Sequence, residues 1–243
     1  MMKKSVSVNF KIRRVSAFLG ICLILTAFYQ ITEISKESER SAASYEKLEQ
    51  KAVVFQKKDV KIDFHLLHQT NEDIVAWILF DNNKISYPIV QGKDNEEYLY
   101  QTADKKKNPA GSIFIDALCS ADFTDSHTII YGHNMKDQSM FGSLKNYNLK
   151  EDYFQENRYF TIYTPEKTLR YEIFAWYEAA ADDDVYQIGF AADELFAEFV
   201  EQMLARRVYD TNVTAGREDR IVTLSTCSAN GKRFVVHGKW KHN

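Results

Sequence analysis

The end of the chain reads Arg220-Ile-Val-Thr-Leu-Ser-Thr-Cys227, then Ser-Ala-Asn-Gly-Lys, then Arg233-Phe-Val-Val-His-Gly-Lys-Trp240. Two apolar, β-branched runs around a short polar break predict a β-hairpin. A cysteine ends the first predicted strand, and an arginine opens the second. The stretch therefore brings a thiol and a guanidinium to the closed end of one hairpin.

The turn decides how the two strands pair. A strict two-residue turn would pair Cys227 with Phe234 and send Arg233 to the opposite face, because a slip of one residue flips every side chain. A three-residue loop with Gly231 in the left-handed conformation instead pairs Cys227 with Arg233, with Cβ atoms about 5 Å apart. We expect this second register, in which the cation favours the thiolate and can stabilise an oxyanion. The alternative is a buried cysteine beside a surface arginine.

The composition excludes several classes of protein. Hydrophobic residues make up 45% of the 243 residues, enough for a substantial core, and the net charge of −3 gives no general case for nucleic acid. The three cysteines, Cys22, Cys119 and Cys227, show no metal-binding spacing, and we expect a free reactive thiol rather than a disulfide framework. No phosphate-binding glycine loop or nucleotide fingerprint is present, so we expect neither a cofactor nor a metal.

The N-terminus predicts a membrane anchor. Residues 1–14 form a basic tail, and the apolar run 15–31 is near the short limit for a spanning helix. Basic residues on the leading side predict a cytoplasmic N-terminus. A cleaved signal peptide is the alternative, but the run lacks a good cleavage site. Residues 32–58 predict a helical stalk, with a disordered tether as the alternative, and 59–243 an extracellular domain.

The extracellular part predicts many short strands and few helices, which is typical of a closed barrel or a sandwich and makes the fold mainly β with an α+β character. The clearest helix is predicted over 193–207, with acidic residues early and basic residues late. Its apolar stripe comprises Leu195, Phe196, Phe199, Val200, Met203 and Leu204. Asp63 is expected to cap a short helix over 63–69.

A reactive thiol at neutral pH needs a base, usually histidine. His133 ends an apolar strand predicted over 128–133, a position where barrel rims place functional groups. His127 is placed in a polar loop, and His237 lies on the Arg233 strand about 13 Å from Arg233. The residues alone leave His133 and His127 open as the partner of the thiol.

Several motifs resemble those of class B sortases. Thr223-Leu-Ser-Thr-Cys227 followed by an arginine is similar to the TLxTC signature of the sortase family. Tyr131-Gly-His-Asn-Met135 with Ser139-Met-Phe-Gly142 resembles the histidine segment of class B. Further similar segments are Tyr87-Pro-Ile-Val-Gln91, Asp94-Asn95 with Tyr98-Leu99, and Gly111-Ser-Ile-Phe-Ile-Asp116. The resemblance covers about residues 60 to 240.

The resemblance implies a closed eight-stranded β-barrel with N-terminal helices and one helix before the catalytic strand. It also implies roles: Cys227 attacks a backbone carbonyl in a C-terminal sorting motif, His133 acts as general acid and base, and Arg233 holds the oxyanion or substrate carbonyl. By the same resemblance, a substrate groove is lined by Asn95, Leu99, Tyr131, Ser225 and Tyr186. The five residues between Cys227 and Arg233 make a shorter loop than many class B enzymes have.

The implied function is a membrane-anchored cysteine transpeptidase with its catalytic domain on the extracellular face. Its implied partners are surface proteins that carry a sorting motif and an amine of a cell-wall peptide. The alternatives are a pilin-polymerising sortase, a thiol hydrolase, and a non-catalytic wall-binding protein. The last would lack the cysteine, histidine or arginine, and all three are present.

Overall fold

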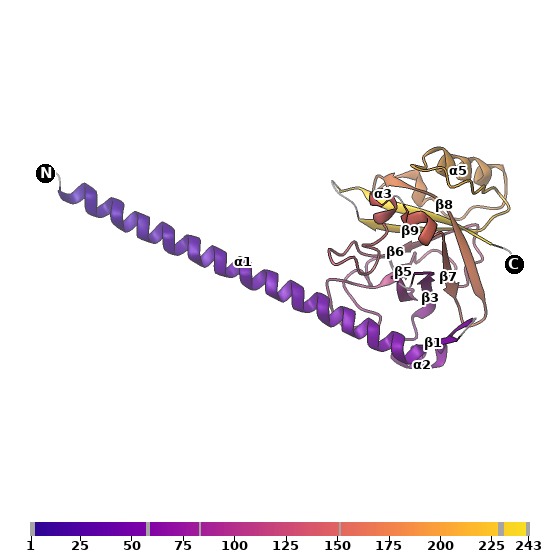
Figure 1. Cartoon of the computed structure of the whole chain (residues 1–243), viewed down its shortest axis with the longest axis horizontal. Coiled ribbons are helices and arrows are strands. Elements are labelled where there is room, and N and C mark those ends of the chain that lie inside the picture. The colour runs from indigo at the N-terminus through magenta and orange to yellow at the C-terminus, as the bar shows by residue number, and fades with distance from the viewer. Residues whose placement is uncertain (1–2, 57–58, 83, 151, 228–230, 242–243) are drawn as a thin grey trace. The chain divides into compact units, whose positions relative to one another are not determined.

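The strands form a closed barrel in the computed structural model, which describes residues 3–56, 59–82, 84–150, 152–227 and 231–241 (Figure 1). Side chains are described for these residues except 3–14, Asp59 and Cys227. The barrel order is β10-β8-β7-β3-β4-β5-β6-β9. The predicted eight-stranded barrel is therefore confirmed.

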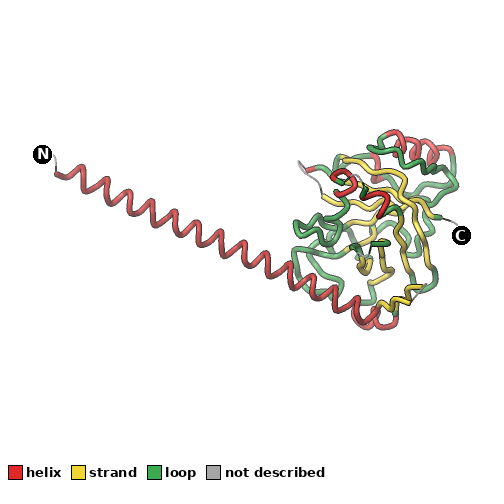
Figure 2. Tube along the Cα trace, in the orientation of Figure 1, coloured by secondary structure: helices red, strands yellow, loops and turns green. Residues whose placement is uncertain are grey.

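The strands of the barrel are short and mostly antiparallel, with parallel pairs at β4–β5 and β6–β9. Figure 2 shows them in yellow, joined by loops in green. Their bounds are β3 Ile74–Phe80, β4 Ser86–Val90, β5 Ile113–Ile115, β6 His127–Tyr131, β7 Tyr159–Tyr163, β8 Thr168–Ala179, β9 Ile221–Cys227 and β10 Arg233–Trp240. A separate hairpin pairs β1 (Val53–Gln56) with β2 (Asp59–Ile62).

The barrel wall is buried on both faces near β9. Val222 and Leu224 belong to the main core, whereas Ile221 packs in a second cluster with residues of α5 (Glu194–Ala205). Successive residues of a strand point to opposite faces. Thr223 and Ser225 therefore share the face of Ile221, on the outer side of the main core.

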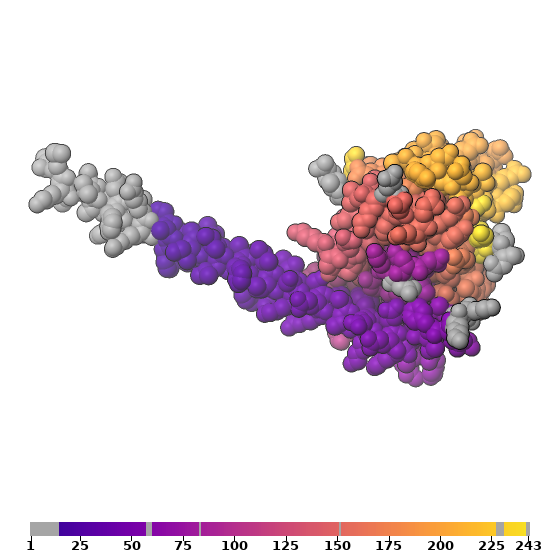
Figure 3. All heavy atoms as spheres, in the orientation of Figure 1, coloured from indigo at the N-terminus to yellow at the C-terminus, as the bar shows by residue number. Residues whose placement is uncertain are grey.

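Helix α5 supplies the outer layer, and it lies at the surface of its unit (Figure 3). Asp193 caps it by accepting a hydrogen bond from the Phe196 amide, as an aspartate at this position is expected to do. The buried stripe holds Phe196, Phe199, Val200 and Met203, but Leu195 is 67% exposed and does not join it.

The remaining helices are α1 Lys3–Ala52, α2 Phe64–Thr70, α3 Asn146–Leu149 and α4 Tyr153–Glu156, with a 3₁₀ turn η1 over Asp184–Tyr186. Asp63 caps α2 by accepting from the Leu66 amide, as predicted. The chain divides into two compact units, 1–40 and 41–243. Within the second unit, the Tyr45 hydroxyl at the end of α1 donates to the Gly111 carbonyl at 2.8 Å.

Helix α1 contains the apolar run. Among the described residues it is the one helix long and apolar enough to cross a membrane, and its most apolar window is not buried. The predicted helical stalk, 32–58, differs at its end: the helix stops at Ala52, and Val53–Gln56 forms β1. The β-branched pair Val53-Val54 and Phe55 favour the strand.

The β9–β10 hairpin has the predicted register. Cys227 pairs with Arg233, Ser225 with Val235, and Thr223 with His237. Gly231 adopts a φ of 73°, which is the left-handed conformation expected for it. Ala229 and Asn230, the other two residues of the predicted loop, lie outside the described residues, as does Ser228.

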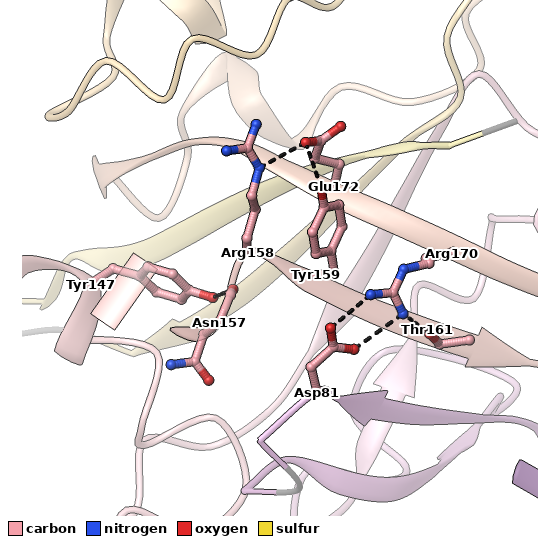
Figure 4. A network of polar contacts seen from close by, with 8 residues as sticks. All are labelled: Asp81, Tyr147, Asn157, Arg158, Tyr159, Thr161, Arg170 and Glu172. Atoms are coloured by element: carbon pink, nitrogen blue, oxygen red, sulfur yellow. Dashed lines mark hydrogen bonds and ion pairs between the residues drawn. The ribbon is translucent and has the colours of Figure 1, made fainter. Parts of the chain in front are cut away.

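A polar network joins β7 and β8 on a different part of the barrel (Figure 4). Glu172 accepts hydrogen bonds from Arg158 at 2.8 Å and from the Tyr159 hydroxyl at 3.1 Å, while Arg170 pairs with Asp81 at 2.7 Å. None of these residues lines the pocket described next. We therefore assign this network to strand pairing.

Candidate active site

One pocket of about 330 Å³ opens beside the ends of β6, β9 and β10. It is lined by seven of the eight residues predicted for the site: Asn95, Leu99, Tyr131, His133, Tyr186, Ser225 and Arg233. The eighth, Cys227, ends β9, and its side chain lies outside the described part of the structure. Residues up to 138 positions apart in the sequence, from Asn95 to Arg233, thus meet in one place.

His133 follows β6 and is half-buried in the pocket. Its Nε2 lies 2.6 Å from the Leu99 carbonyl oxygen, and the Tyr100 ring is 5.8 Å away. A carbonyl can only accept, so Nε2 carries a proton. The other nitrogen, Nδ1, is then the one that can gain or lose a proton toward a substrate.

Arg233 opens β10 directly opposite Cys227. Its Nη1 donates a long hydrogen bond, 3.5 Å, to the Lys232 carbonyl, and among the described residues it forms no ion pair. A guanidinium without a carboxylate partner keeps its donors available for an anionic or carbonyl oxygen. The register therefore places a cation beside the residue that carries the thiol.

A buried carboxylate organises one side of the pocket. Asp116 Oδ2 accepts hydrogen bonds from Asn95 Nδ2 at 2.8 Å and from the Tyr131 hydroxyl at 3.0 Å. The side-chain oxygen of Asn95, Oδ1, accepts from the backbone amide of Ala117 at 2.8 Å. Burial, followed by the charge of Asp116, raises the pKa of Tyr131. Tyr131 is therefore a neutral donor, and Asp116 fixes two pocket side chains at once.

Tyr186 lies beside Tyr131 in the pocket lining. Its hydroxyl lies 2.9 Å from the Ser225 hydroxyl, and its ring stacks with that of Tyr131 at 6.3 Å between centroids. Tyr186 stands at the end of η1, whose first residue is preceded by the capping Asp183. These two contacts tie Tyr186 to β9 and to the end of β6.

Sequence reasoning missed four residues that line the pocket: Phe114, Gly132, Ala181 and Thr226. Phe114 and Gly132 were visible within the quoted motifs, yet nothing in the sequence showed that they face the pocket. Gly132 is required sterically, because a Cβ there would lie 2.5 Å from Ile113 Cδ1. Asp116 was also quoted, but its role depends on contacts that no local pattern shows.

His127 was placed in a polar loop, and this was wrong. It is the first residue of β6 and is fully buried, with its ring 5.1 Å from that of Phe199. It does not line the pocket. The sequence around it is polar up to Ser126, and only the pairing of β6 with β9 shows that the strand begins at His127.

The residue types brought together here are those that suit acyl transfer. A thiol nucleophile, a histidine that can give or take a proton, and a cation placed for an oxyanion are the groups that such a reaction needs. Asn95 has a second side-chain N–H besides the one that it donates to Asp116, and this group can donate to a peptide carbonyl.

Comparisons with known proteins agree with this geometry. Residues 80–241 match the family described as the sortase domain. The chain is 37% identical to a sortase B of Listeria monocytogenes over 185 residues, which covers 74% of this chain and 75% of that protein. It is 30% identical to a sortase B of Staphylococcus aureus over 228 residues, covering 91% and 93%.

A solved structure, described as a Staphylococcus aureus sortase B–substrate complex, superimposes with a TM-score of 0.74 at 29% identity. The match covers 85% of this chain and 98% of that one. The similarity therefore extends over most of the chain.

Proposed function

Because the chain belongs to the sortase family, on its sortase B branch, we propose that the pocket cleaves a sorting-motif peptide and joins its new carboxyl end to an amine. The enzyme class, a cysteine transpeptidase, follows from the family. The observation that carries the site assignment is the β9–β10 register, which pairs Cys227 with Arg233 at the pocket that also holds His133.

In the proposed first step, the Cys227 thiolate attacks the scissile carbonyl carbon. Negative charge develops on the carbonyl oxygen, where the Arg233 guanidinium stabilises it. The C–N bond then breaks, and protonated His133 gives its Nδ1 proton to the leaving amine. The products of this step are a thioester on Cys227 and the released C-terminal peptide.

In the second step an amine attacks the thioester. His133, now neutral, takes a proton from the attacking nitrogen, the new amide bond forms, and the thiolate leaves. An amine of a cell-wall peptide is the proposed acceptor. Water would give hydrolysis by the same route, so the chemistry of the site alone does not separate transfer from hydrolysis.

The binding roles are proposed on position. Asn95, held by Asp116, offers its amide to the peptide backbone, and Leu99 supplies an apolar contact. Tyr131, Tyr186 and Ser225 form the opposite wall and limit the width of the groove. A peptide bound between these walls would present one carbonyl toward Arg233.

We also propose that residues 15–31 anchor the chain in the membrane with residues 1–14 in the cytoplasm and the barrel outside. The support is one apolar helix in the described residues and the basic residues before it. Single cysteines introduced at Ser5 and at Glu96, on a Cys22→Ser, Cys119→Ala, Cys227→Ala background, test this orientation. In intact cells an impermeant thiol reagent should label position 96 alone, and labelling of position 5 alone would reverse the proposed topology.

The deciding experiment for the reaction uses the full chain in detergent micelles with fluorogenic sorting-motif peptides. Each peptide is tested with a diaminopimelate-bearing amine, a glycine peptide, a lysine-bearing peptide, or no amine, and with Cys227→Ala as control. Cleavage that requires Cys227 and yields an amine-joined product supports the proposal, and the preferred amine separates wall anchoring from pilin joining. Cleavage without any joined product would favour a hydrolase.

A further inference from the structure

A buried chain of polar side chains runs behind the pocket. His127 on β6, Thr223 on β9 and His237 on β10 are each 0% exposed. His127 Nδ1 lies 2.7 Å from the Gln187 carbonyl oxygen, and its Nε2 lies 2.7 Å from the Thr223 hydroxyl. The same hydroxyl lies 2.9 Å from His237 Nδ1.

The Gln187 carbonyl at one end of this chain determines which atom of each hydrogen bond carries the proton. It can only accept, so His127 carries its proton on Nδ1 and presents an unprotonated Nε2. Thr223 must therefore donate to His127 and accept from His237 Nδ1. His237 Nε2 then has no proton, and among the described residues it has no hydrogen-bond partner. Both imidazoles are neutral. His237 donates to Thr223, Thr223 donates to His127, and His127 donates to the Gln187 carbonyl.

Gln187 directly follows Tyr186, the pocket wall. The amides of Tyr186 and Gln187 close the 3₁₀ turn by donating to Asp183 and Asp184. In this turn Val185 is buried, whereas Asp184 and Gln187 are exposed. The bond from His127 is thus a buried anchor placed one residue beyond the side chain that contacts Ser225.

We propose that His127 is a positioning residue for the substrate pocket. By holding the Gln187 carbonyl, it keeps Tyr186 against Ser225 and Tyr131, and so fixes the width of the groove that receives the peptide. It touches neither the peptide nor the reacting atoms. The expected change in KM rests on the proposed function. The ordering of Tyr186 and Gln187 can be measured without substrate or catalysis.

Two substitutions separate this role from simple packing. His127→Phe keeps a ring beside Phe199 and removes both hydrogen bonds. His127→Asn keeps a donor near the position of Nδ1 but loses the bond to Thr223. It should therefore restore the hydrogen bond to the Gln187 carbonyl and the position of Tyr186. His237→Phe is the matched control, because it removes the far end of the same chain while the His127–Gln187 bond stays.

The kinetic test measures KM and kcat for a cleaved sorting peptide with the full chain. His127→Phe should raise KM about 5- to 10-fold, the effect of losing one anchoring hydrogen bond, and change kcat little. His127→Asn should return KM to near the wild-type value, and His237→Phe should leave it unchanged. Equal increases in all three variants would assign the network to fold stability and overturn the proposal.

The second test measures hydrogen exchange at the Tyr186 and Gln187 amides without substrate. Exchange should rise in His127→Phe, fall back in His127→Asn, and stay at the wild-type rate in His237→Phe. Unchanged exchange in a folded His127→Phe overturns the proposal even if the wild type proves inactive on every peptide. Should His127→Phe not fold, His127→Gln replaces it, since its longer amide reaches toward Thr223 instead of Gln187.

Discussion

Arg233 faces Cys227 across the β9–β10 ladder, and the shape of its guanidinium matters as well as its charge. Arg233→Lys keeps the cation but replaces a planar fork of donors with a single ammonium on a flexible stem. We expect kcat/KM to fall by about 10²-fold, near the loss seen when an oxyanion donor is removed. Lys232→Arg is the control, because the neighbouring cation pairs with Glu178 outside the pocket. Wild-type activity in Arg233→Lys would contradict the oxyanion role.

Asp116 acts on the pocket through its neighbours. In Asp116→Asn one oxygen becomes an NH₂ group, which must face either the Leu118 amide, a donor to Oδ1, or the Asn95 and Tyr131 donors to Oδ2, so at least one of these hydrogen bonds is lost. We expect KM for the sorting peptide to rise about tenfold, since a displaced Asn95 loses its fixed orientation. Asp122→Asn, a carboxylate that lies outside the pocket, serves as control. Equal changes in the two variants would remove Asp116 from the binding machinery.

The residues that sequence could find and those it missed differ in kind. The pairing of Cys227 with Arg233 could be predicted from the hairpin turn and from the two-residue period of the strands, both of which are local features of the sequence. Asp116 and His127 act through partners far away in sequence, such as Thr223, which is 96 positions from His127. Only closure of the barrel brings these partners together, so the side-chain type alone gave no signal for them.

At the scale of the element, the hairpin depends on Gly231. Its φ of 73° is unfavourable for a β-branched residue, yet a Cβ there would meet no atom of the described residues within 4 Å. Gly231→Val therefore tests backbone conformation without a clash. We expect it to destabilise the protein by about 1 kcal/mol and to lower kcat/KM, because the loop holds Arg233 in register.

Two controls make this test specific. Gly216→Val also enters open space, at a residue without a left-handed φ, and it should leave both Tm and activity close to wild type. Gly231→Asn should retain most activity, since asparagine tolerates the left-handed region. An unchanged Tm and kcat/KM in Gly231→Val would show that the register does not depend on this residue.

Helices long enough for the 3.6-residue pattern of apolar residues to repeat could be predicted from the sequence, and shorter helices could not. The predicted helix 193–207 is α5. Helices α3 and α4 have four residues each, too few for a 3.6-residue pattern to repeat. They form because Tyr147, Tyr153 and Phe154 bury their rings near Trp176, a tertiary cause.

At the scale of the whole molecule, the buried histidines link folding to pH. Burial lowers the pKa of His127 to about 4 and lowers that of His237 well below its usual value. In the unfolded chain both return to about 6.5. Between these values the unfolded state binds more protons than the folded state, so stability must fall as the pH falls.

The size of the effect is measurable. At pH 5 the His127 linkage alone removes about 2 kcal/mol of the stability present at pH 7.5, and His237 adds to this. Carboxylates with lowered pKa, such as Asp73 and Asp104, lose their stabilising effect only at more acidic pH. We therefore expect Tm of the full chain in micelles to drop from pH 7.5 to pH 5.

Substitutions identify which residues make Tm depend on pH. His127→Asn and His237→Phe each remove one titrating group, so each should flatten the dependence of Tm on pH, whatever it does to Tm at pH 7.5. Gly216→Val should leave the slope unchanged. A Tm that stays constant or rises on acidification would mean that water or another charge reaches the imidazoles in the folded state. The buried chain from Gln187 to His237 would then not be the closed, neutral network that the bond directions require.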